Sequence, residues 1–370
     1  MKIVSIVGAR PQFIKAALVS RALRACPGVL EVLVHTGQHY DHNLSDLIFY
    51  ELEIPRADFH LGIGSGLHGA QTGKMLEAVE RLLLDQRPEC VLVYGDTNST
   101  LAGAVSATKA HISVAHIEAG LRSFNRRMPE EINRILTDHC SDLLLAPSLN
   151  AVENLRQEGI PDQRIHLVGD VMYDVVRVHT SKAQAKSTIL RDLRLVTGSY
   201  VLATVHRAEN TDDLKRLRSV FEGLCAVAEE VPLVFPLHPR TRKVLQELDD
   251  VCLPAGFQLI EPVGYLDMLT LEKHARVIAT DSGGVQKEAF YHRVPCVTLR
   301  EETEWVELVQ LGWSRLAPPH DPAIVHREVM RAYRGEQPSR SERGEPTPFG
   351  TGHAAEAIRD VILTRGSRRK

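Results

Sequence analysis

The sequence predicts an α/β protein with two doubly wound domains that face each other across a cleft. Short apolar runs rich in β-branched residues alternate with longer amphipathic stretches along the whole chain. This alternation is typical of a parallel sheet with helices on both faces. It occurs in two series separated by a polar stretch, and 370 residues are enough for two hydrophobic cores.

The first series supplies the strands of an N-terminal domain, which we place at residues 1–170. Most of its apolar runs are followed by a helix-like segment, as successive βαβ units require. The expected strands are residues 3–7, 31–35, 90–94, 113–117, 143–146 and 164–168.

The second series defines a C-terminal domain at residues 171–352, beginning with one or two connecting helices over 171–198. Its last part, 335–352, is rich in Gly, Pro, Ser and charge and is expected to be a linker or loop. We expect the segment 353–370 to form a helix that packs back on the first domain. The expected strands are residues 201–205, 233–236, 258–260, 277–280 and 296–299.

Charge and composition exclude several classes of protein. The net charge of −3, from 47 acidic and 44 basic residues, gives no bulk attraction to nucleic acid or to an anionic membrane. The first apolar run is too short for a signal-peptide core, and no later run reaches the roughly 18 residues of a transmembrane helix. The six cysteines are scattered without a C-x-x-C pair. We therefore expect them to be reduced and mostly buried in a cytoplasmic protein without a metal site.

Ligands of doubly wound domains bind outside the carboxyl ends of the strands, so polar residues at strand ends are candidates for function. Arg10 and Lys15 flank the start of the helix that follows the first strand. Cations there oppose the helix dipole, so an anionic ligand explains them better than helix stability does, although a solvated turn is the alternative. The segment lacks G-x-G-x-x-G, and we predict no dinucleotide cofactor.

Three carboxylates follow strands or open a helix in the same domain. Asp96 follows one strand, and its alternative role is to cap the next helix. Glu118 follows the neighbouring strand, where a buried carboxylate needs a partner, and Arg122 is a candidate. Glu130 lies in the first turn of a helix, where glutamates also commonly complement the dipole.

The C-terminal domain carries a predicted phosphate site. His206 and His238 stand at successive strand ends beside arginines, which favours a cleft over two structural histidines. A turn between a strand and a helix presents backbone N–H groups and a positive dipole end, which suit a phosphate or diphosphate. Glu288, further along that helix, is placed to accept hydrogen bonds from ribose hydroxyls; a plain turn is the alternative. The turn consists of Ser282, Gly283 and Gly284.

Together these motifs resemble the UDP-N-acetylglucosamine 2-epimerase family, in its non-hydrolysing branch. The resemblance covers nearly the whole chain and implies two Rossmann-like domains in the glycosyltransferase-B arrangement, usually as a homodimer. It rests on Gly8-Ala9-Arg10-Pro11, Gly95-Asp96-Thr97, Glu118-Ala119-Gly120-Leu121-Arg122, Pro129-Glu130-Glu131, His206-Arg207-Ala208-Glu209-Asn210 and Asp281-Ser282-Gly283-Gly284-Val285-Gln286.

The resemblance implies that UDP is eliminated across C1–C2 to give a glycal, and then re-adds while a proton reaches the opposite face of C2. Because no carbonyl activates the C2 proton, the leaving diphosphate needs strong stabilisation. Two faces of one carbon require at least two proton carriers. By resemblance these are Asp96, Glu118 and Glu130, and His206 assists at the diphosphate or the sugar. The residues implied to hold UDP are Arg10, Lys15, Arg122, His238, Ser282, Gly283, Gly284, Glu288, Arg300 and Glu302.

Departures from the family pattern bear on substrate and regulation. Three segments resemble the branch that acts on UDP-2,3-diacetamido-2,3-dideoxyglucuronate, which leaves that substrate open. Ala208 replaces an arginine that touches an allosteric UDP-sugar in many bacterial members, Asp41 replaces a glutamine and Ala70 an arginine. We therefore predict no substrate activation through a second site. The three segments are Thr303-Glu304-Trp305-Val306-Glu307, Arg122-Ser123-Phe124-Asn125 and Pro262-Val263-Gly264-Tyr265-Leu266.

Three other functions fit parts of the pattern. A retaining glycosyltransferase would use the same UDP site, but it needs an acceptor groove and has less use for three carboxylates. A hydrolysing epimerase usually follows the first strand with Arg-Ala, whereas this chain has Arg10-Pro11-Gln12. A catalytically silent sensor of nucleotide sugars would not need the intact set of carboxylates.

Overall fold

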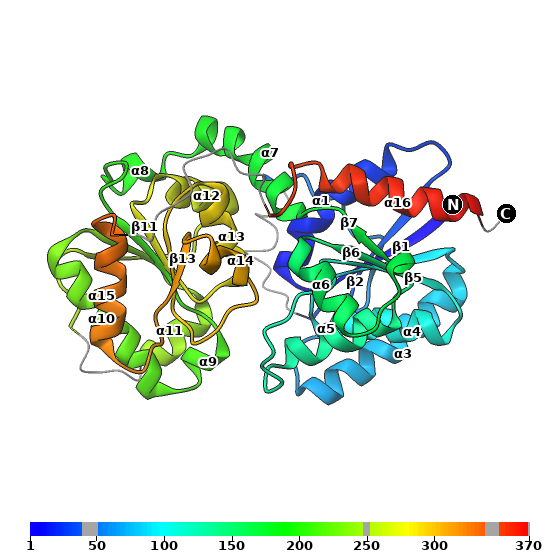
Figure 1. Cartoon of the computed structure of the whole chain (residues 1–370), viewed down its shortest axis with the longest axis horizontal. Coiled ribbons are helices and arrows are strands. Elements are labelled where there is room, and N and C mark those ends of the chain that lie inside the picture. Colours follow the sequence, from blue (N-terminus) through cyan, green and yellow to red (C-terminus); the bar gives the residue numbers. More distant parts are fainter. Residues whose placement is uncertain (39–50, 247–251, 337–347, 369–370) are drawn as a thin grey trace. The chain divides into compact units, whose positions relative to one another are not determined.

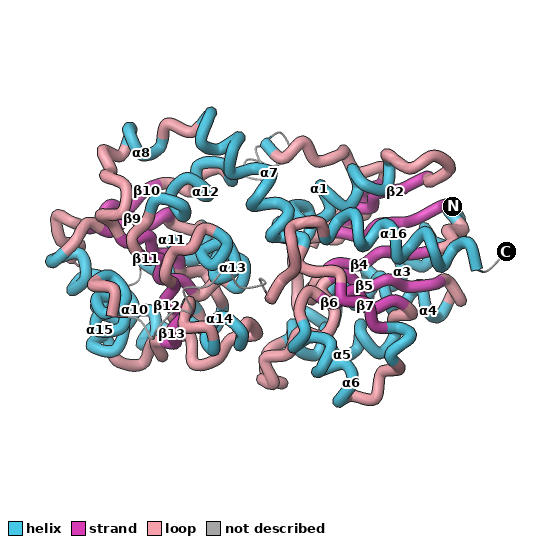
Figure 2. Tube along the Cα trace, turned by 45° about the horizontal axis from the view of Figure 1, so that its top comes forward, coloured by secondary structure: helices cyan, strands magenta, loops and turns pink. Residues whose placement is uncertain are grey.

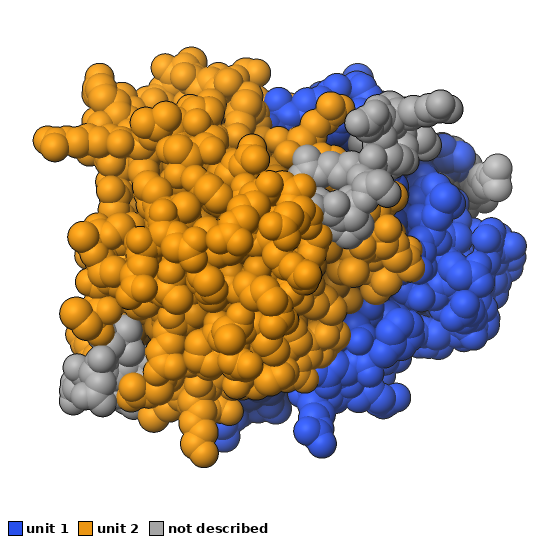
Figure 3. Space-filling view, turned by 60° about the vertical axis from the view of Figure 1, so that its left-hand side comes forward, with its two compact units in different colours: residues 1–177, 346–370 blue, residues 178–345 orange. Residues whose placement is uncertain are grey.

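A computed structural model describes residues 1–38, 51–246, 252–336 and 348–368. The chain divides into unit 1, residues 1–177 with 346–370, and unit 2, residues 178–345 (Figure 3). The sequence analysis divided the chain at residues 170 and 352 instead. The boundary between the units after residue 177 falls inside one helix, α7 (Val171–Lys186), whose residues belong to both units. Asp41 and most of the expected loop 335–352 lie outside the described residues.

Unit 1 is built on a seven-stranded parallel sheet in the order β3-β2-β1-β4-β5-β6-β7. Its central strands are apolar on both faces because helices cover both sides of the sheet, as Figure 2 shows. The order reverses between β1 and β4, the place where doubly wound sheets bind ligands. The strands are β1 (Lys2–Val7), β2 (Leu30–His35), β3 (Phe59–His60), β4 (Cys90–Tyr94), β5 (Ser113–Ile117), β6 (Leu143–Ala146) and β7 (Ile165–Leu167).

The last helix of the chain, α16, belongs to unit 1 and packs against α1 (Figure 1). Asp174 on α7 accepts a hydrogen bond from Ala355 N at 2.8 Å and so caps the start of α16. The remaining helices link successive strands. The helices of unit 1 are α1 (Arg10–Arg24), α3 (His68–Gln86), α4 (Asn98–Lys109), α5 (Pro129–Cys140), α6 (Leu149–Gln157), η1 (Asp162–Arg164) and α16 (Ala354–Arg368).

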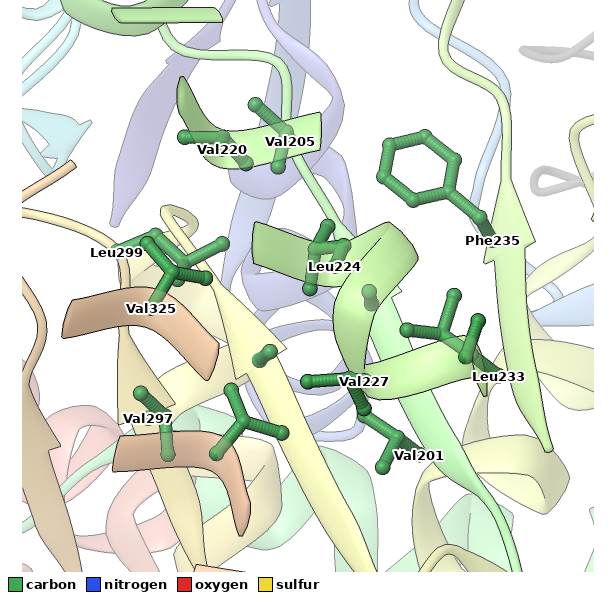
Figure 4. Packing of buried hydrophobic residues seen from close by; sticks show 14 of the residues in the cluster. Val201, Val205, Val220, Leu224, Val227, Leu233, Phe235, Val297, Leu299 and Val325 are labelled. Atoms are coloured by element: carbon green, nitrogen blue, oxygen red, sulfur yellow. The ribbon is translucent and has the colours of Figure 1, made fainter. Parts of the chain in front are cut away.

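Unit 2 has a six-stranded parallel sheet in the order β10-β9-β8-β11-β12-β13. The main core fills one face of this sheet, where Leu224 and Val227 lie among Val201, Leu233 and Val297 (Figure 4). Three phenylalanine rings lie 5.2–6.2 Å apart, centroid to centroid, in the same cluster. The strands are β8 (Val201–Thr204), β9 (Leu233–Pro236), β10 (Phe257–Ile260), β11 (Val277–Thr280), β12 (Cys296–Thr298) and β13 (Ser314–Leu316).

The helices of unit 2 include the predicted connecting segment, which forms the end of α7 and a short helix, α8. Most of the others link successive strands, as in unit 1. They are α8 (Ile189–Asp192), α9 (Ala208–Thr211), α10 (Leu214–Glu230), α11 (Pro239–Leu245), α12 (Tyr265–His274), α13 (Gly283–Tyr291), α14 (Val306–Gln310) and α15 (Pro322–Tyr333).

The predicted α/β class and its two parallel sheets are confirmed. One detail was wrong: of the six free cysteines, Cys90 and Cys296 are buried, whereas three are half-buried and Cys252 is exposed. Among the described residues, no helix is long and apolar enough to cross a membrane. The same residues contain no cluster of three or more His, Cys, Asp or Glu side chains suited to a metal ion.

Candidate active site

Two carboxylates that were predicted as site residues in unit 1 lie just after neighbouring strands. Strands β4 and β5 pair in parallel with Tyr94 opposite Ile117, so Asp96 and Glu118 both lie just beyond the carboxyl ends of these strands. Gly95 N donates to Ile117 O at 3.0 Å and extends this pairing. Gly95 has φ of +61° and Glu118 has φ of +72°. A non-glycine residue in that left-handed region is strained, and such strain is common at functional positions.

Asp96 is bound by a guanidinium group. Arg134 on α5 donates to Asp96 Oδ2 from Nε at 3.0 Å and from Nη2 at 2.6 Å. Thr97, not Asp96, caps α4, so the alternative role considered for Asp96 is wrong. The sequence analysis did not single out Arg134. Its position four residues after Glu130, on the same face of a helix, was the available signal.

Glu118 forms its ion pair with Lys15, and both side chains are about nine-tenths buried. This corrects the expectation that Arg122 would be the partner of Glu118. A Cβ added to Gly95 would lie 3.3 Å from Glu118 Oε2 and 3.6 Å from Lys15 Nζ. The backbone between Asp96 and β4 therefore packs directly against the Lys15–Glu118 pair.

Arg122 instead lies in a buried network behind the strand ends. Its Nη1 contacts Asp138 Oδ2 at 2.8 Å, and its Nε and Nη2 donate to the two carboxylate oxygens of Glu158 at 2.6 Å. Burial acts to raise the pKa of Asp138, but His116 and Arg122 together hold it below its usual value. Arg122 is engaged within the chain, and a role in substrate binding stays a prediction.

The two glutamates that open α5 differ in their surroundings. Glu131 is buried and accepts hydrogen bonds from Ser123 N at 3.0 Å, Phe124 N at 2.9 Å and Arg134 Nη1 at 2.7 Å. Glu130 is only half-buried, and within the described ranges it has no hydrogen-bond or ion-pair partner. Glu130 is thus available to a ligand, while Glu131 holds Arg134 in place.

Arg10 and Lys15 both lie on α1, as predicted. Arg10 opens the helix, but its side chain is outside the described part of the structure. Gln12 on the same helix is buried and binds the neighbouring loop: its Nε2 donates to Tyr94 O at 2.6 Å and its Oε1 accepts from Gly8 N at 2.7 Å. The β1 and β4 strand ends are therefore held together by one amide side chain.

In unit 2, His206 and His238 stack with ring centroids 5.0 Å apart. The buried carboxylate of Asp281 accepts from His206 N at 3.1 Å and from Arg207 N at 3.0 Å, and it fixes the loop after β8. His238 caps α11, with its Nδ1 accepting from Arg240 N at 3.1 Å. The two predicted histidines are thus brought together at adjacent strand ends.

The predicted phosphate turn forms the start of α13. Ser282 is the N-cap and accepts from Val285 N, while Gly283 is buried and Gly284 is exposed. The first N–H groups of a helix have no partner within the helix, so this turn presents donors and a positive dipole end. Glu288, on the same helix, accepts from Tyr265 Oη at 2.8 Å.

Glu304 lies against this turn with two arginines. Arg300 Nη1 contacts Glu304 Oε2 at 2.8 Å, and Arg207 Nη2 contacts Oε1 at 3.3 Å. A Cβ on Gly283 would meet Glu304 Oε1 at 2.3 Å. Arg300 is buried, whereas Glu302 is half-buried. The UDP-binding roles of Arg300 and Glu302 stay predictions.

Comparison with known proteins gives consistent matches over the whole chain. A family model for UDP-N-acetylglucosamine 2-epimerase matches residues 21–363. A Pseudomonas aeruginosa protein named UDP-2,3-diacetamido-2,3-dideoxy-D-glucuronate 2-epimerase is 51% identical over 98% of this chain and 99% of its own length. A Methanocaldococcus jannaschii UDP-N-acetylglucosamine 2-epimerase is 42% identical over 99% of this chain and 100% of its own.

Solved structures agree with these matches. The crystal structure of the Methanocaldococcus jannaschii enzyme in complex with UDP-GlcNAc and UDP superimposes with a TM-score of 0.90, covering 99% of this chain and 100% of that one at 42% identity. The Neisseria meningitidis UDP-GlcNAc 2-epimerase bound to UDP-GlcNAc gives a TM-score of 0.87 at 30% identity, covering 98% of this chain and 100% of that one.

Proposed function

Because the chain belongs to the UDP-N-acetylglucosamine 2-epimerase family, we propose that it interconverts UDP-N-acetylglucosamine and UDP-N-acetylmannosamine without hydrolysis. The observation that carries this proposal within unit 1 is the pair of carboxylates at adjacent strand ends. Asp96 and Glu118 are each bound by a cation, Arg134 and Lys15. Each carboxylate thus has an opposite charge in contact, and carboxylates are among the side chains that transfer protons in catalysis.

In the proposed reaction, one carboxylate removes the C2 proton while the C1–O bond breaks, and UDP leaves a bound glycal. UDP then re-adds at C1 while another carboxylic acid delivers a proton to the opposite face of C2. Asp96, Glu118 and Glu130 supply these proton carriers. The net change is inversion at C2, with no oxidant, reductant or water consumed.

The groups proposed to hold UDP lie mainly in unit 2. The N–H groups of the Ser282–Gly284 turn stabilise negative charge on the departing diphosphate. His206 assists there, fixed through its backbone by Asp281, and His238 stacks on it. Glu288 accepts from the ribose hydroxyls. Arg300, paired with Glu304 beside the turn, is proposed to bind UDP with them. Arg122 of unit 1 is proposed to bind the UDP-sugar as well.

A second candidate substrate is UDP-2,3-diacetamido-2,3-dideoxyglucuronate. The 51% identity to the Pseudomonas aeruginosa protein named for that compound supports it, as does the segment around Trp305. In this segment Lys287 Nζ lies 4.1 Å from the centroid of the Trp305 ring, beside Glu304 and the turn at Gly283. A uronate adds one carboxylate to the sugar, so the two candidates differ in charge as well as in size.

The test is incubation with UDP-N-acetylglucosamine in D₂O, followed by proton NMR and mass spectrometry. A mixture of gluco and manno nucleotide sugars with deuterium at C2 would support the proposed reaction. Free UDP with N-acetylmannosamine would instead indicate a hydrolysing enzyme. If C2 does not exchange, the same experiment with the 3-acetamido uronate nucleotide decides between the two substrates. Asp96→Asn is the control, because it should abolish exchange while sparing UDP binding.

The family resemblance also leads us to propose a cytoplasmic homodimer that serves polysaccharide biosynthesis. Light scattering on the purified protein tests the assembly. A mass of one chain at micromolar concentration would contradict the dimer without affecting the proposed reaction.

A further inference from the structure

His116 is a fully buried side chain that the proposed reaction does not use. It lies on β5, two residues before Glu118, and points toward the neighbouring strand end. Its Nε2 lies 2.7 Å from Gly95 O, and its Nδ1 lies 2.7 Å from Asp138 Oδ1. One imidazole ring therefore connects the loop that carries Asp96 to a carboxylate on α5.

The hydrogen-bond partners determine the protonation of this ring. A backbone carbonyl can only accept, so the Nε2 of His116 carries a proton. Asp138 is ionised, because its Oδ2 accepts from Gly120 N at 3.1 Å and from Arg122, and because its pKa is held low. An ionised carboxylate also only accepts, so Nδ1 carries a proton as well. Both nitrogens donate, which makes the ring an imidazolium.

The charges of the network support this assignment. A buried cation is costly unless it is paired and hydrogen-bonded. Here two cations, His116 and Arg122, face two carboxylates, Asp138 and Glu158. The network is therefore neutral as a whole, and each group in it has an opposite charge in contact.

The network forms hydrogen bonds at both strand ends that are followed by a proposed acid/base group, Asp96 or Glu118. His116 holds the carbonyl of Gly95, the residue before Asp96. Asp138 holds the N–H of Gly120, two residues after Glu118. Both glycines have positive φ, +61° for Gly95 and +83° for Gly120, a conformation that glycine adopts without strain, and these two hydrogen bonds fix the orientation of the peptide groups there.

We propose that His116 is a positioning residue: a buried imidazolium that, paired with Asp138, fixes the Gly95 and Gly120 turns and thereby the relative placement of Asp96 and Glu118. The proposal rests on the proposed function for its catalytic meaning. Its physical basis is that a displacement of about 1 Å of a reacting group costs on the order of 10²-fold in rate.

The kinetic test uses His116→Gln, because an amide carries no positive charge and lacks a ring with one N–H donor on each side. We expect kcat for C2 epimerisation to fall on the order of 10²-fold, while KM and the Kd for UDP stay within about threefold. The reason for the split is that most of the groups proposed to hold UDP lie in unit 2, and that His116 itself bonds Gly95 and Asp138, neither of which is among those groups. Chemistry then becomes rate-limiting, so the isotope effect with C2-deuterated substrate should rise in the variant.

Glu158→Gln is the matched control. Glu158 belongs to the same network and pairs with Arg122, but no contact joins it to His116. Glu158 is partly exposed and bonds neither Gly95 nor Gly120, so this variant should lower kcat much less than His116→Gln does. A His116→Gln variant with kcat within threefold of the parent protein would overturn the proposal, and so would a variant that lost UDP binding and kcat to the same extent.

Asp138→Asn provides a second variant if His116→Gln does not fold, because the ring then keeps its bond to Gly95 but loses its counter-ion. We expect a similar fall in kcat, and no further fall in the double variant, since residues that act as a unit are not additive. An additive double variant would contradict the pairing.

Nitrogen-15 NMR of histidine-labelled protein tests the imidazolium without any turnover. The resonance missing from His116→Gln should show both ring nitrogens protonated, whereas a neutral tautomer would overturn the assignment. If the parent protein turned over neither nucleotide sugar, both the proposed function and the positioning role would be contradicted. The NMR result would still decide the charge of the ring.

Discussion

Two adjacent glycines in the predicted phosphate turn of unit 2, Ser282–Gly284, should respond oppositely to the same substitution. A Cβ at Gly283 would lie 2.3 Å from Glu304 Oε1, and also 3.3 Å from both Arg207 Nη2 and Trp305 Nε1. A Cβ at Gly284 would have nothing nearer than Ser282 Oγ at 3.8 Å. Gly283→Ala must therefore displace a buried, ion-paired glutamate, whereas Gly284→Ala adds a methyl group in open space.

The magnitudes follow from packing. Overfilling a close-packed site costs about 1–3 kcal/mol, because side chains leave their preferred rotamers. For a unit of this size that lowers Tm by roughly 2–12 °C. Gly284→Ala restricts the unfolded chain without a clash, so it should leave the free energy of unfolding unchanged or raise it by up to about 1 kcal/mol.

Calorimetry of both variants, together with UDP titration, provides the assay. Gly283→Ala should lower both Tm and UDP affinity, because Glu304 also contacts Arg300 and Arg207. If Gly283→Ala were as stable as the parent protein, or if Gly284→Ala were the more damaging change, the close contact at Gly283 would be refuted.

Four further predictions concern unit 1 and regulation. Lys15→Met should lower the free energy of unfolding by about 3–5 kcal/mol, because it removes the ammonium partner of the buried Glu118 carboxylate. Adding Glu118→Gln should restore stability in denaturant melts, but it should not restore activity in epimerase assays. Glu131→Gln should lower kcat more than UDP affinity, because Glu131 anchors Arg134 against Asp96; equal losses in assay and titration would argue for simple unfolding. Burial, and then the nearby His60, lower the pKa of His35 from 6.5 to about 4, so the unfolded chain takes up the proton first as pH falls. The stability of the parent protein should therefore decrease from pH 6.5 toward 4, and Tm measured at pH 7 and pH 5 should fall less in His35→Gln. Finally, the kinetics should be hyperbolic with the epimerase substrate; sigmoidal kinetics that become hyperbolic on adding a trace of UDP-N-acetylglucosamine would contradict the reasoning from Ala208 and Ala70.

The sequence predicted strands well where both faces are buried. The expected strands at 90–94, 113–117, 143–146, 233–236 and 277–280 match β4, β5, β6, β9 and β11 residue for residue. The analysis missed β3 (Phe59–His60) and β13 (Ser314–Leu316), which are short, edge strands of their sheets. Two exposed residues in β3, and one buried and two half-buried residues in β13, carry too weak a hydrophobic pattern to be distinguished from a loop.

Candidate site residues were easier to find in the sequence than the side chains that contact them. Asp96, Glu118 and His206 each follow an apolar run, a local signal that one sequence contains. Their partners are distant in the chain: Lys15 is 103 residues from Glu118, and Arg134 is 38 residues from Asp96. No spacing rule reaches across a sheet, and for that reason the nearby Arg122 was offered as the partner of Glu118.

These long-range pairs also affect how mutations at the site should be interpreted. Removing Lys15 or Arg134 leaves a carboxylate without its cation, so activity falls whether the cation takes part in the reaction or only holds the carboxylate. Loss of activity in a single variant is therefore not sufficient to identify a catalytic group. A double variant that neutralises both partners separates a role in the reaction from a simple loss of stability, because it restores the local charge balance without restoring the chemistry. If stability returns while activity does not, the reaction needs the pair itself and not only the stability that the pair provides.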